Sequence, residues 1–314
     1  MRNHFKGKDF LTLMDFSQDE IGHILKVSYE LKMKWASREP HEYLRGRTLA
    51  ALFEKESTRT RTSFQAACAH LGAQSFYMRP GELQLSRGES VKDTARVIDR
   101  YCDGLFLRSA FGTGQDRLNE FAKYMDNPVI NACTDYTHPC QALADLLTIW
   151  EHKGRLEGLK IAWSGDPWNV CHSDMIAGCM MGSDVYAAFP EGFNPDAKIL
   201  EFAKGAAKKN GRKMVVTRDL KEALTDADVI IANTWHSMGF DGDKERRSKA
   251  FTPYQINKES VKVSKSDFIF MHPGPYYPGE EVTSEIIEGP HSVIYDQAEN
   301  RMHTEKGVLV LFVG

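Results

Sequence analysis

The segment from Arg47 to Gly72 reads RTLAALFEKESTRTRTSFQAACAHLG and changes character halfway along. Its first part, TLAALF, is apolar and has the length of one buried strand, whereas TRTSFQAACAHL has helical spacing and is followed by a glycine. Residues 57–63, which span the junction and the start of the helical run, contain five hydroxyl side chains and two arginines. The segment therefore predicts a strand followed by a helix with a polar junction, which is the repeating unit of α/β proteins.

The same alternation of short apolar runs and amphipathic segments continues along the chain. Strands that alternate with helices of this length predict βαβ units and buried parallel sheets. We expect strands at 48–53, 74–78, 103–108, 128–132, 159–165, 184–189, 213–217, 228–233 and 267–270. We expect helices at 17–35, 60–71, 90–101, 115–125, 138–154, 169–182, 195–211, 219–227 and 300–314, the first with Ser17 as N-cap and Glu20 closing a capping box.

The chain of 314 residues is too long for one ordinary core and predicts two domains. We place the first at residues 1–150, completed by the C-terminal helix from about 297 to 314, and the second at 151–296. The expected fold class is α/β, with a parallel sheet flanked by helices in each domain and the active site in the cleft between them. The segment 240–253, FDGDKERRSKAFTP, is polar and lacks a strand pattern, so we expect a long loop there.

Composition excludes several classes of partner. The net charge is -3, from 40 basic and 43 acidic side chains without a long basic run, which argues against nucleic acid and against an anionic membrane surface. The N-terminus lacks a signal-peptide pattern, and no run of roughly 18 apolar residues predicts a membrane span. Six cysteines without C-x-x-C spacing predict reduced core residues, and together these features predict a cytoplasmic protein.

The polar junction at residues 57–61, STRTR, predicts an anion site. A helix N-terminus offers unpaired backbone N–H groups and the positive end of the helix dipole, and Arg59 adds a fork that matches phosphate oxygens. The alternative is an ordinary serine cap with a solvated basic first turn. However, each cation there opposes the dipole by about 0.3–1 kcal/mol, so two arginines make sense mainly if an anion offsets them.

Other polar residues follow predicted strands or begin predicted helices. Arg108 ends the strand DGLFLR, where α/β proteins place ligand contacts, although a lone arginine there is more often a surface residue. In HPCQ, His138 and Gln141 lie at the start of a long helix, where the histidine could equally be a simple cap. The segment SGDPWN lacks the G-x-G-x-x-G pattern, which disfavours a nicotinamide-dependent oxidoreductase.

With STRTRTSF, HPCQ, NTWHSMG and AENR in this order, the chain resembles the aspartate/ornithine carbamoyltransferase family nearly from end to end. Within that family, SMG and DQAENRMHT are most similar to the ornithine enzymes. The resemblance implies transfer of the carbamoyl group of carbamoyl phosphate to a small amine, with L-ornithine giving L-citrulline and phosphate as the best candidate. It also implies no cofactor, no metal, and self-association as a homotrimer or a multiple of one.

The resemblance further implies which residues bind the donor. The phosphate would be held by Ser57, Thr58, Arg59 and Thr60. The carbonyl oxygen would contact Arg108, His138 and Thr60, with Gln141 on the carbamoyl nitrogen, and these four would form the catalytic set. Gln84 and Arg87, in ELQLSRGES, match the loop that family members lend to a neighbouring subunit.

For the acceptor, the resemblance implies a second set of residues: Asn169, Asn233, Ser237, Met238 and His272, with Pro273, Gly274 and Arg301 completing the cleft on the donor side. The implied chemistry is attack of a neutral amine on the carbamoyl carbon, with charge building on the carbonyl oxygen as phosphate leaves. Fixed donors aimed at that oxygen carry most of such a reaction, and the leaving phosphate can take the proton of the amine.

Two departures leave the acceptor open. The ornithine enzymes carry His-Cys-Leu-Pro where this chain has His272-Pro-Gly-Pro, and Asp where it has Asn233. Yet the following YYPGEEV lacks the arginine that the aspartate enzymes place there. Aspartate or another small amine therefore remains an alternative acceptor. A non-catalytic metabolite-binding homologue is a third possibility, against which the intact Arg59, Arg108, His138 and Gln141 argue.

Overall fold

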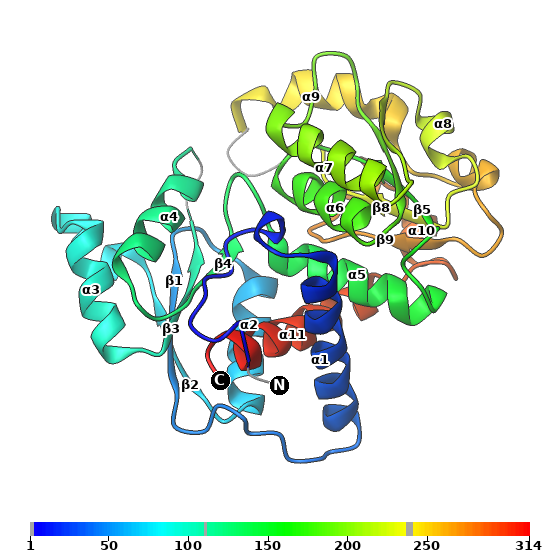
Figure 1. Cartoon of the computed structure of the whole chain (residues 1–314). Coiled ribbons are helices and arrows are strands. Elements are labelled where there is room, and N and C mark those ends of the chain that lie inside the picture. Colours follow the sequence, from blue (N-terminus) through cyan, green and yellow to red (C-terminus); the bar gives the residue numbers. More distant parts are fainter. Residues whose placement is uncertain (1–2, 110–111, 237–240) are drawn as a thin grey trace. The chain divides into compact units, whose positions relative to one another are not determined.

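Parallel strands form one sheet in each of the two units into which the chain divides (Figure 1). The computed structural model describes residues 3–109, 112–236 and 241–314. Unit 1 comprises Met1–Ala144 and Glu299–Gly314, and unit 2 comprises Asp145–Ala298. The predicted α/β class, with two parallel sheets flanked by helices, is confirmed.

In unit 1 the strand order is β2-β1-β3-β4, and each neighbouring pair is parallel. The strands are β1 (Thr48–Phe53), β2 (Gln74–Met78), β3 (Gly104–Arg108) and β4 (Val129–Cys133). The register places Phe53 beside Arg108, so β1 and β3 end together and the chain leaves both strands at the same edge. The helices are α1 (Gln18–Ala36), α2 (Thr58–His70), α3 (Val91–Tyr101), α4 (Gly114–Tyr124), the start of α5 (Pro139–Lys153) and most of α11 (Ile294–Phe312).

The N-terminal segment from residue 3 onward lies against the end of α11 in unit 1 (Figure 1). The backbone N–H of Gly7 donates to the carbonyl of Phe312 at 3.0 Å, so the N-terminal segment is tied to the end of α11. The predicted N-terminus of α1 is confirmed: Ser17 Oγ accepts from Glu20 N at 3.2 Å, and a Glu20 carboxylate oxygen accepts from Ser17 N at 2.8 Å. This reciprocal cap fixes where α1 begins.

Unit 2 carries the second sheet, with strand order β7-β6-β5-β8-β9 and all pairs parallel. The strands are β5 (Lys160–Ser164), β6 (Asp184–Ala188), β7 (Met214–Thr217), β8 (Val229–Ala232) and β9 (Ile269–Met271). The helices are α6 (Asn169–Met180), α7 (Ala197–Lys209), α8 (Leu220–Leu224), α9 (Lys244–Phe251) and α10 (Ser284–Ile287). β8 is buried along its whole length, which is typical of a parallel strand with both sheet faces covered.

The loop predicted at 240–253 is wrong for most of its length. Residues 244–251 form α9, and its two buried side chains, Arg247 and Phe251, are four residues apart on one face. The remaining polar side chains of KERRSKAF are mostly exposed, so the segment is an amphipathic helix whose buried face includes an arginine. The sequence pattern treated Arg247 as a polar surface residue, so the buried face of this helix was not recognised and the helix was not predicted.

The terminal helix and the burial of the cysteines were also predicted from the sequence. The terminal helix begins at Ile294, six residues before the predicted start at Asn300. The six cysteine side chains are all buried, as predicted for core residues. Among the helices in the described ranges, none combines the length and the apolar character that a membrane crossing requires.

The close contact between α1 and α11 predicts a glycine requirement at Gly307. A Cβ atom there would lie 2.1 Å from Ser28 Oγ and 3.2 Å from the carbonyl oxygen of Ile24. We expect Gly307→Ala to lower the free energy of unfolding by about 1–3 kcal/mol through overpacking, measured by urea denaturation. Gly22→Ala, in α1 with nothing within 4 Å of its added Cβ, is the control and should leave stability equal or higher. Equal unfolding midpoints for the two variants would contradict the close approach.

Candidate active site

The predicted polar junction lies at the N-terminus of α2. Ser57 is the N-cap residue, and its Oγ accepts from the backbone N–H of Thr60 at 3.2 Å. The Arg61 guanidinium stacks on the ring of Tyr77 at 3.6 Å. The first turn of α2 retains the features of an anion site, namely a helix N-terminus with hydroxyl side chains and Arg59.

Two buried arginines meet at one hydroxyl in this first turn. Thr60 Oγ1 accepts from Arg108 Nη1 at 3.4 Å and from Arg301 Nη2 at 3.2 Å. Arg301 Nη1 also donates to Gln141 Oε1 at 2.7 Å. The first turn of α2, the end of β3, the start of α5 and the middle of α11 are thus joined through side chains of unit 1 alone. The structure brings together four of the residues predicted for the donor: Thr60, Arg108, Gln141 and Arg301.

The electrostatics of this cluster favour an anion. Arg108 is 7% exposed and Arg301 is 2% exposed, and the Nε–H group of each is buried without an acceptor among the described residues. Burial without an acceptor is costly for a charged donor, so these N–H groups are suited to a ligand that supplies oxygen atoms. Two guanidinium groups pointing at the same hydroxyl also repel each other, and a bound dianion would offset that repulsion.

His138 is buried immediately before α5. Burial, together with the positive charges of Arg301 and Arg108, holds the pKa of His138 well below its usual value. The imidazole is therefore neutral at physiological pH. A neutral ring can donate one hydrogen bond without adding a third positive charge to the cluster.

In unit 2, Asn233 directly follows β8 and is buried. Its backbone N–H donates to the carbonyl of Ser164 at 2.9 Å, which ties the end of β8 to the end of β5. Gly165 follows with φ of +137°, and a Cβ atom at this position would lie 2.3 Å from the Asn233 carbonyl oxygen. Only glycine fits here, because the two backbones approach too closely for any side chain. Asn169 begins α6, with its Oδ1 accepting from Val170 N at 2.9 Å.

The predicted His272 loop is held from inside unit 2. His272 Nδ1 accepts from the backbone N–H of Gly274 at 2.9 Å, so the ring proton lies on Nε2, which donates to Glu281 Oε1 at 3.2 Å. Glu281 Oε1 also accepts from Tyr277 N at 2.7 Å. Both ring nitrogens of His272 are therefore engaged within the loop. In this arrangement the histidine shapes the loop, and its role in acceptor binding stays a prediction.

A chain of hydrogen bonds continues from this loop into the interior of unit 2. His272 N donates to Gln297 Oε1 at 2.8 Å, and Gln297 Nε2 donates to Asp145 Oδ1 at 2.6 Å. Asp145 in turn shares a hydrogen bond with Asp174. Burial, followed by the charge and the hydrogen bond of Asp145, raises the pKa of Asp174 well above its usual value, so Asp174 supplies the proton in this contact.

The other predicted site residues lie outside these clusters. Gln84 and Arg87 are exposed on a short 3-10 helix of unit 1 (Gln84–Arg87). Ser237 and Met238 lie outside the described residues. Their assignment, like every other assignment to a ligand, stays a prediction.

Sequence reasoning missed a buried ion pair beside Asn233. Arg247 Nη1 lies 2.9 Å from Asp166 Oδ1, and Arg247 Nη1 also donates to the carbonyl of Trp235 at 3.1 Å. Asp166 follows β5 and Trp235 follows β8, so one arginine from α9 fixes both loops that surround Asn233. The available signal was the spacing of Arg247 and Phe251, which matches one face of a helix.

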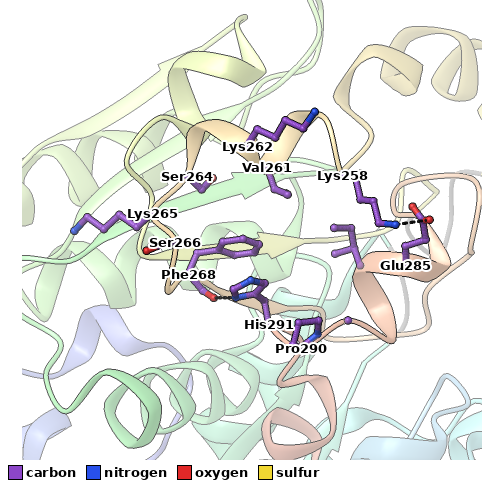
Figure 2. Close-up of a pocket in the computed structure, with 12 residues that line it drawn as sticks. Lys258, Val261, Lys262, Ser264, Lys265, Ser266, Phe268, Glu285, Pro290 and His291 are labelled. Carbon is purple, nitrogen blue, oxygen red and sulfur yellow. Dashed lines mark hydrogen bonds and ion pairs between the residues drawn. The ribbon is translucent and has the colours of Figure 1, made fainter.

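A separate pocket of about 310 Å³ lies elsewhere in unit 2 (Figure 2). Three lysines line it, but each is already paired: Lys258 with Glu285, Lys262 with Glu259 and Lys265 with Asp228, all at 2.7 Å. The Phe268 ring stacks on His291, whose Nδ1 contacts the Phe268 carbonyl at 2.8 Å. Because its charges are satisfied within the protein, this pocket lacks the unpaired donors that distinguish the Thr60 cluster.

Comparisons with known proteins cover almost the whole chain. Residues 8–151 match the family model "Aspartate/ornithine carbamoyltransferase, carbamoyl-P binding domain", and residues 157–312 match "Aspartate/ornithine carbamoyltransferase, Asp/Orn binding domain". The chain is 47% identical to an ornithine carbamoyltransferase of Pyrococcus horikoshii over 98% of this chain and 96% of the relative. It is 46% identical to one of Carboxydothermus hydrogenoformans over 99% of both.

Solved structures show the same similarity. The ornithine carbamoyltransferase from Pyrococcus furiosus superposes with a TM-score of 0.95 at 46% identity, covering 99% of this chain and 98% of that one. The enzyme from Gloeobacter violaceus gives a TM-score of 0.88 at 38% identity, covering 99% of both chains.

The junction at Thr60 yields a stability prediction. Thr60→Val keeps the branched shape but removes the oxygen that accepts from Arg108 and Arg301. We expect the free energy of unfolding in urea to fall by about 1–3 kcal/mol, because buried charged donors lose their acceptor. Thr60→Ser keeps the oxygen and is the matched control. If the valine variant were as stable as the serine variant, the hydroxyl would not be what holds the two arginines.

Proposed function

Because the chain belongs to the aspartate/ornithine carbamoyltransferase family, we propose that it transfers the carbamoyl group of carbamoyl phosphate to the side-chain amine of L-ornithine, giving L-citrulline and phosphate. The chain is a carbamoyltransferase, and its relatives at 46–47% identity are named ornithine carbamoyltransferases. The observation that carries the proposal is the meeting of Arg108 and Arg301 at Thr60, which creates buried positive charge suited to a phosphorylated donor.

In this proposal the donor binds to unit 1. Its phosphate lies at the N-terminus of α2, where Ser57, Thr58 and Arg59 supply hydroxyl, backbone and guanidinium donors. Its carbonyl oxygen lies near Thr60 and Arg108, and Gln141 contacts the carbamoyl nitrogen. Gln141 Oε1 accepts a hydrogen bond from Arg301 Nη1, so Arg301 orients the amide that contacts the carbamoyl nitrogen.

The reaction then requires little chemistry from side chains. The neutral amine attacks the carbamoyl carbon, negative charge builds on the carbonyl oxygen, and the bond to the phosphate oxygen breaks as the carbonyl reforms. Arg108 and the neutral His138 stabilise the oxyanion, which is the largest contribution in reactions of this kind. The departing phosphate accepts the proton that the amine loses, so no protein base is consumed.

The acceptor binds, in this proposal, to unit 2 near Asn169 and Asn233, with Ser237 and Met238 as further contacts implied by the family resemblance. Asn233 is fixed from both sides by Ser164 and by the loops that Arg247 holds. His272 acts on the acceptor through the shape of its loop. The family resemblance implies that Pro273 and Gly274, in the same loop, contact the donor. Aspartate is disfavoured because residues 276–282 contain no arginine for a second carboxylate.

We further propose a homotrimer, or a multiple of one, in which Gln84 and Arg87 reach the site of a neighbouring chain. Both are exposed on their short helix, so they are available to another subunit. A cytoplasmic location also stays a prediction.

The direct test is formation of citrulline from carbamoyl phosphate and ornithine, with aspartate and other small amines assayed in parallel. Product formation from ornithine supports the proposal, and product formation with aspartate alone, or with none of the amines, overturns it.

We expect Arg108→Ala to lower kcat for ornithine by about 10²–10³, the usual effect of removing one oxyanion donor. Near-normal turnover in this variant would show that the carbonyl oxygen lies elsewhere.

Asn233 favours a more specific expectation about the acceptor. A carboxylate at this position would pair with an α-ammonium group, whereas the amide offers only a neutral acceptor. Charged hydrogen bonds contribute about 1.5–3 kcal/mol and neutral ones about 0.5–1.5 kcal/mol, so the difference is about tenfold in affinity. We expect Asn233→Asp to raise kcat/KM for ornithine, most clearly when combined with Pro273→Cys and Gly274→Leu. If neither Asn233→Asp nor the triple variant raises kcat/KM, the amide of Asn233 does not limit the use of ornithine.

A further inference from the structure

Glu305 is a buried carboxylate that the proposed reaction does not use. It lies one helical turn after Arg301 on α11 and is 1% exposed. Arg301 Nη2 donates to Glu305 Oε1 at 3.1 Å and to Thr60 Oγ1 at 3.2 Å. One nitrogen of the guanidinium is therefore shared between the donor site and this carboxylate.

The groups around Glu305 come from three helices. On α11 itself it faces Arg301, from α2 it is near Ser63 and Cys68, and from α5 it is near Cys140. Burial and the nearby carboxylate keep the pKa of both cysteine thiols far above its usual value, so the thiols are neutral. Arg301 is consequently the cation that offsets the charge of Glu305.

Together, these surroundings place the pKa of Glu305 near neutral pH. Burial raises the pKa of Glu305 to about 7, against the opposing effects of Arg301 and the Ser63 hydroxyl. His138 on the other side of Arg301 is neutral, so it adds no positive charge that would favour the carboxylate. A small change in the charge near Arg301 can therefore change the protonation of Glu305.

We propose that Glu305 is a positioning residue that couples binding of the donor's phosphate to uptake of a proton. The inference rests on the proposed function, in which the phosphate lies at the first turn of α2 and Arg301 contacts Thr60 of that turn. The bound dianion places negative charge next to the Thr60–Arg301 contact, where it repels the Glu305 carboxylate and competes with it for the charge of Arg301. Protonation of Glu305 removes the repulsion, and its carbonyl oxygen can still accept from Arg301 Nη2, so the arginine keeps its place and directs its charge to the donor.

The sign of the pH effect follows from this competition. Below pH 6 the carboxyl is protonated in both free and bound protein, and binding takes up no proton. Between pH 7 and 8 the carboxyl is more ionised in the free protein than in the bound form, so binding takes up a fraction of a proton and affinity falls as pH rises. With a shift of about one pKa unit on binding, uptake at pH 8 is about 0.4 proton, and Kd rises about sixfold between pH 6.5 and 8.5.

The experiment is calorimetric titration of the full-length protein with carbamoyl phosphate alone at pH 8, in buffers of different ionisation enthalpy. Carbamoyl phosphate is an acyl phosphate, whose second pKa is no higher than the roughly 6 of a phosphate ester, so it is already dianionic at this pH and uptake reports the protein. We expect uptake in the wild type, its loss in Glu305→Gln, and no change in Glu299→Gln, which removes a half-exposed carboxylate from the same helix. The pH dependence of KM for carbamoyl phosphate should flatten in Glu305→Gln while kcat changes little.

The outcomes are distinguishable. Failure of the donor to bind wild type would refute the proposed function. Binding without proton uptake in wild type, or with equal uptake in Glu305→Gln, would refute the role of Glu305 and leave the proposed function intact. Should Glu305→Gln not fold, the wild-type titration keeps the proposal falsifiable, because the absence of proton uptake at pH 8 would refute it.

Discussion

The hydroxyl of Thr60 is the contact on which the proposed donor site depends. It accepts from two buried guanidinium groups, and those groups belong to elements far apart in the sequence, β3 and α11. Like charges approach this closely only when the fold forces them to, and here α11 is held by its packing against α1 at Gly307 and by the tie from Gly7 to Phe312. The fold thus concentrates positive charge before any ligand arrives, which is the preorganisation that electrostatic catalysis requires.

Unit 2 is built by a different means, with its buried charges paired. Arg247 pairs with Asp166, His272 donates to Glu281, and Asp174 shares its proton with Asp145. Breaking such a buried pair leaves an uncompensated charge, so these contacts hold the loops around Asn233 and His272 in fixed shapes. Unit 1 also has such a pair, Arg301 with Glu305, but a second buried guanidinium, that of Arg108, donates to the same Thr60 hydroxyl as Arg301.

Much of this could be predicted from the sequence because it depends on local pattern. The segment 47–72 contains its strand, its N-cap and its hydroxyls within one short run, and both the α/β alternation and the Ser17 cap follow from the same kind of signal. Contacts between distant residues could not be predicted from local pattern. The spacing of Thr60, Arg108 and Arg301 does not indicate that they meet, and only the family resemblance placed them at one site. The helix that contains Arg247 was missed because a buried arginine looks like a surface residue in a hydrophobicity pattern. The proton of Glu305 depends on its burial, which only the packed structure reveals.

We propose that unit 1 contains, within one chain, the buried donors that bind carbamoyl phosphate through its charge. The most direct measurement is the affinity of the wild-type protein and of Arg301→Met and Arg108→Met for carbamoyl phosphate in the absence of any amine. The account predicts that wild type binds the donor by itself and that each methionine variant, which keeps an unbranched apolar side chain but no charge, loses at least tenfold in affinity, the equivalent of about 1.4 kcal/mol. Donor binding that required the amine, or an unchanged affinity in either methionine variant, would contradict this expectation.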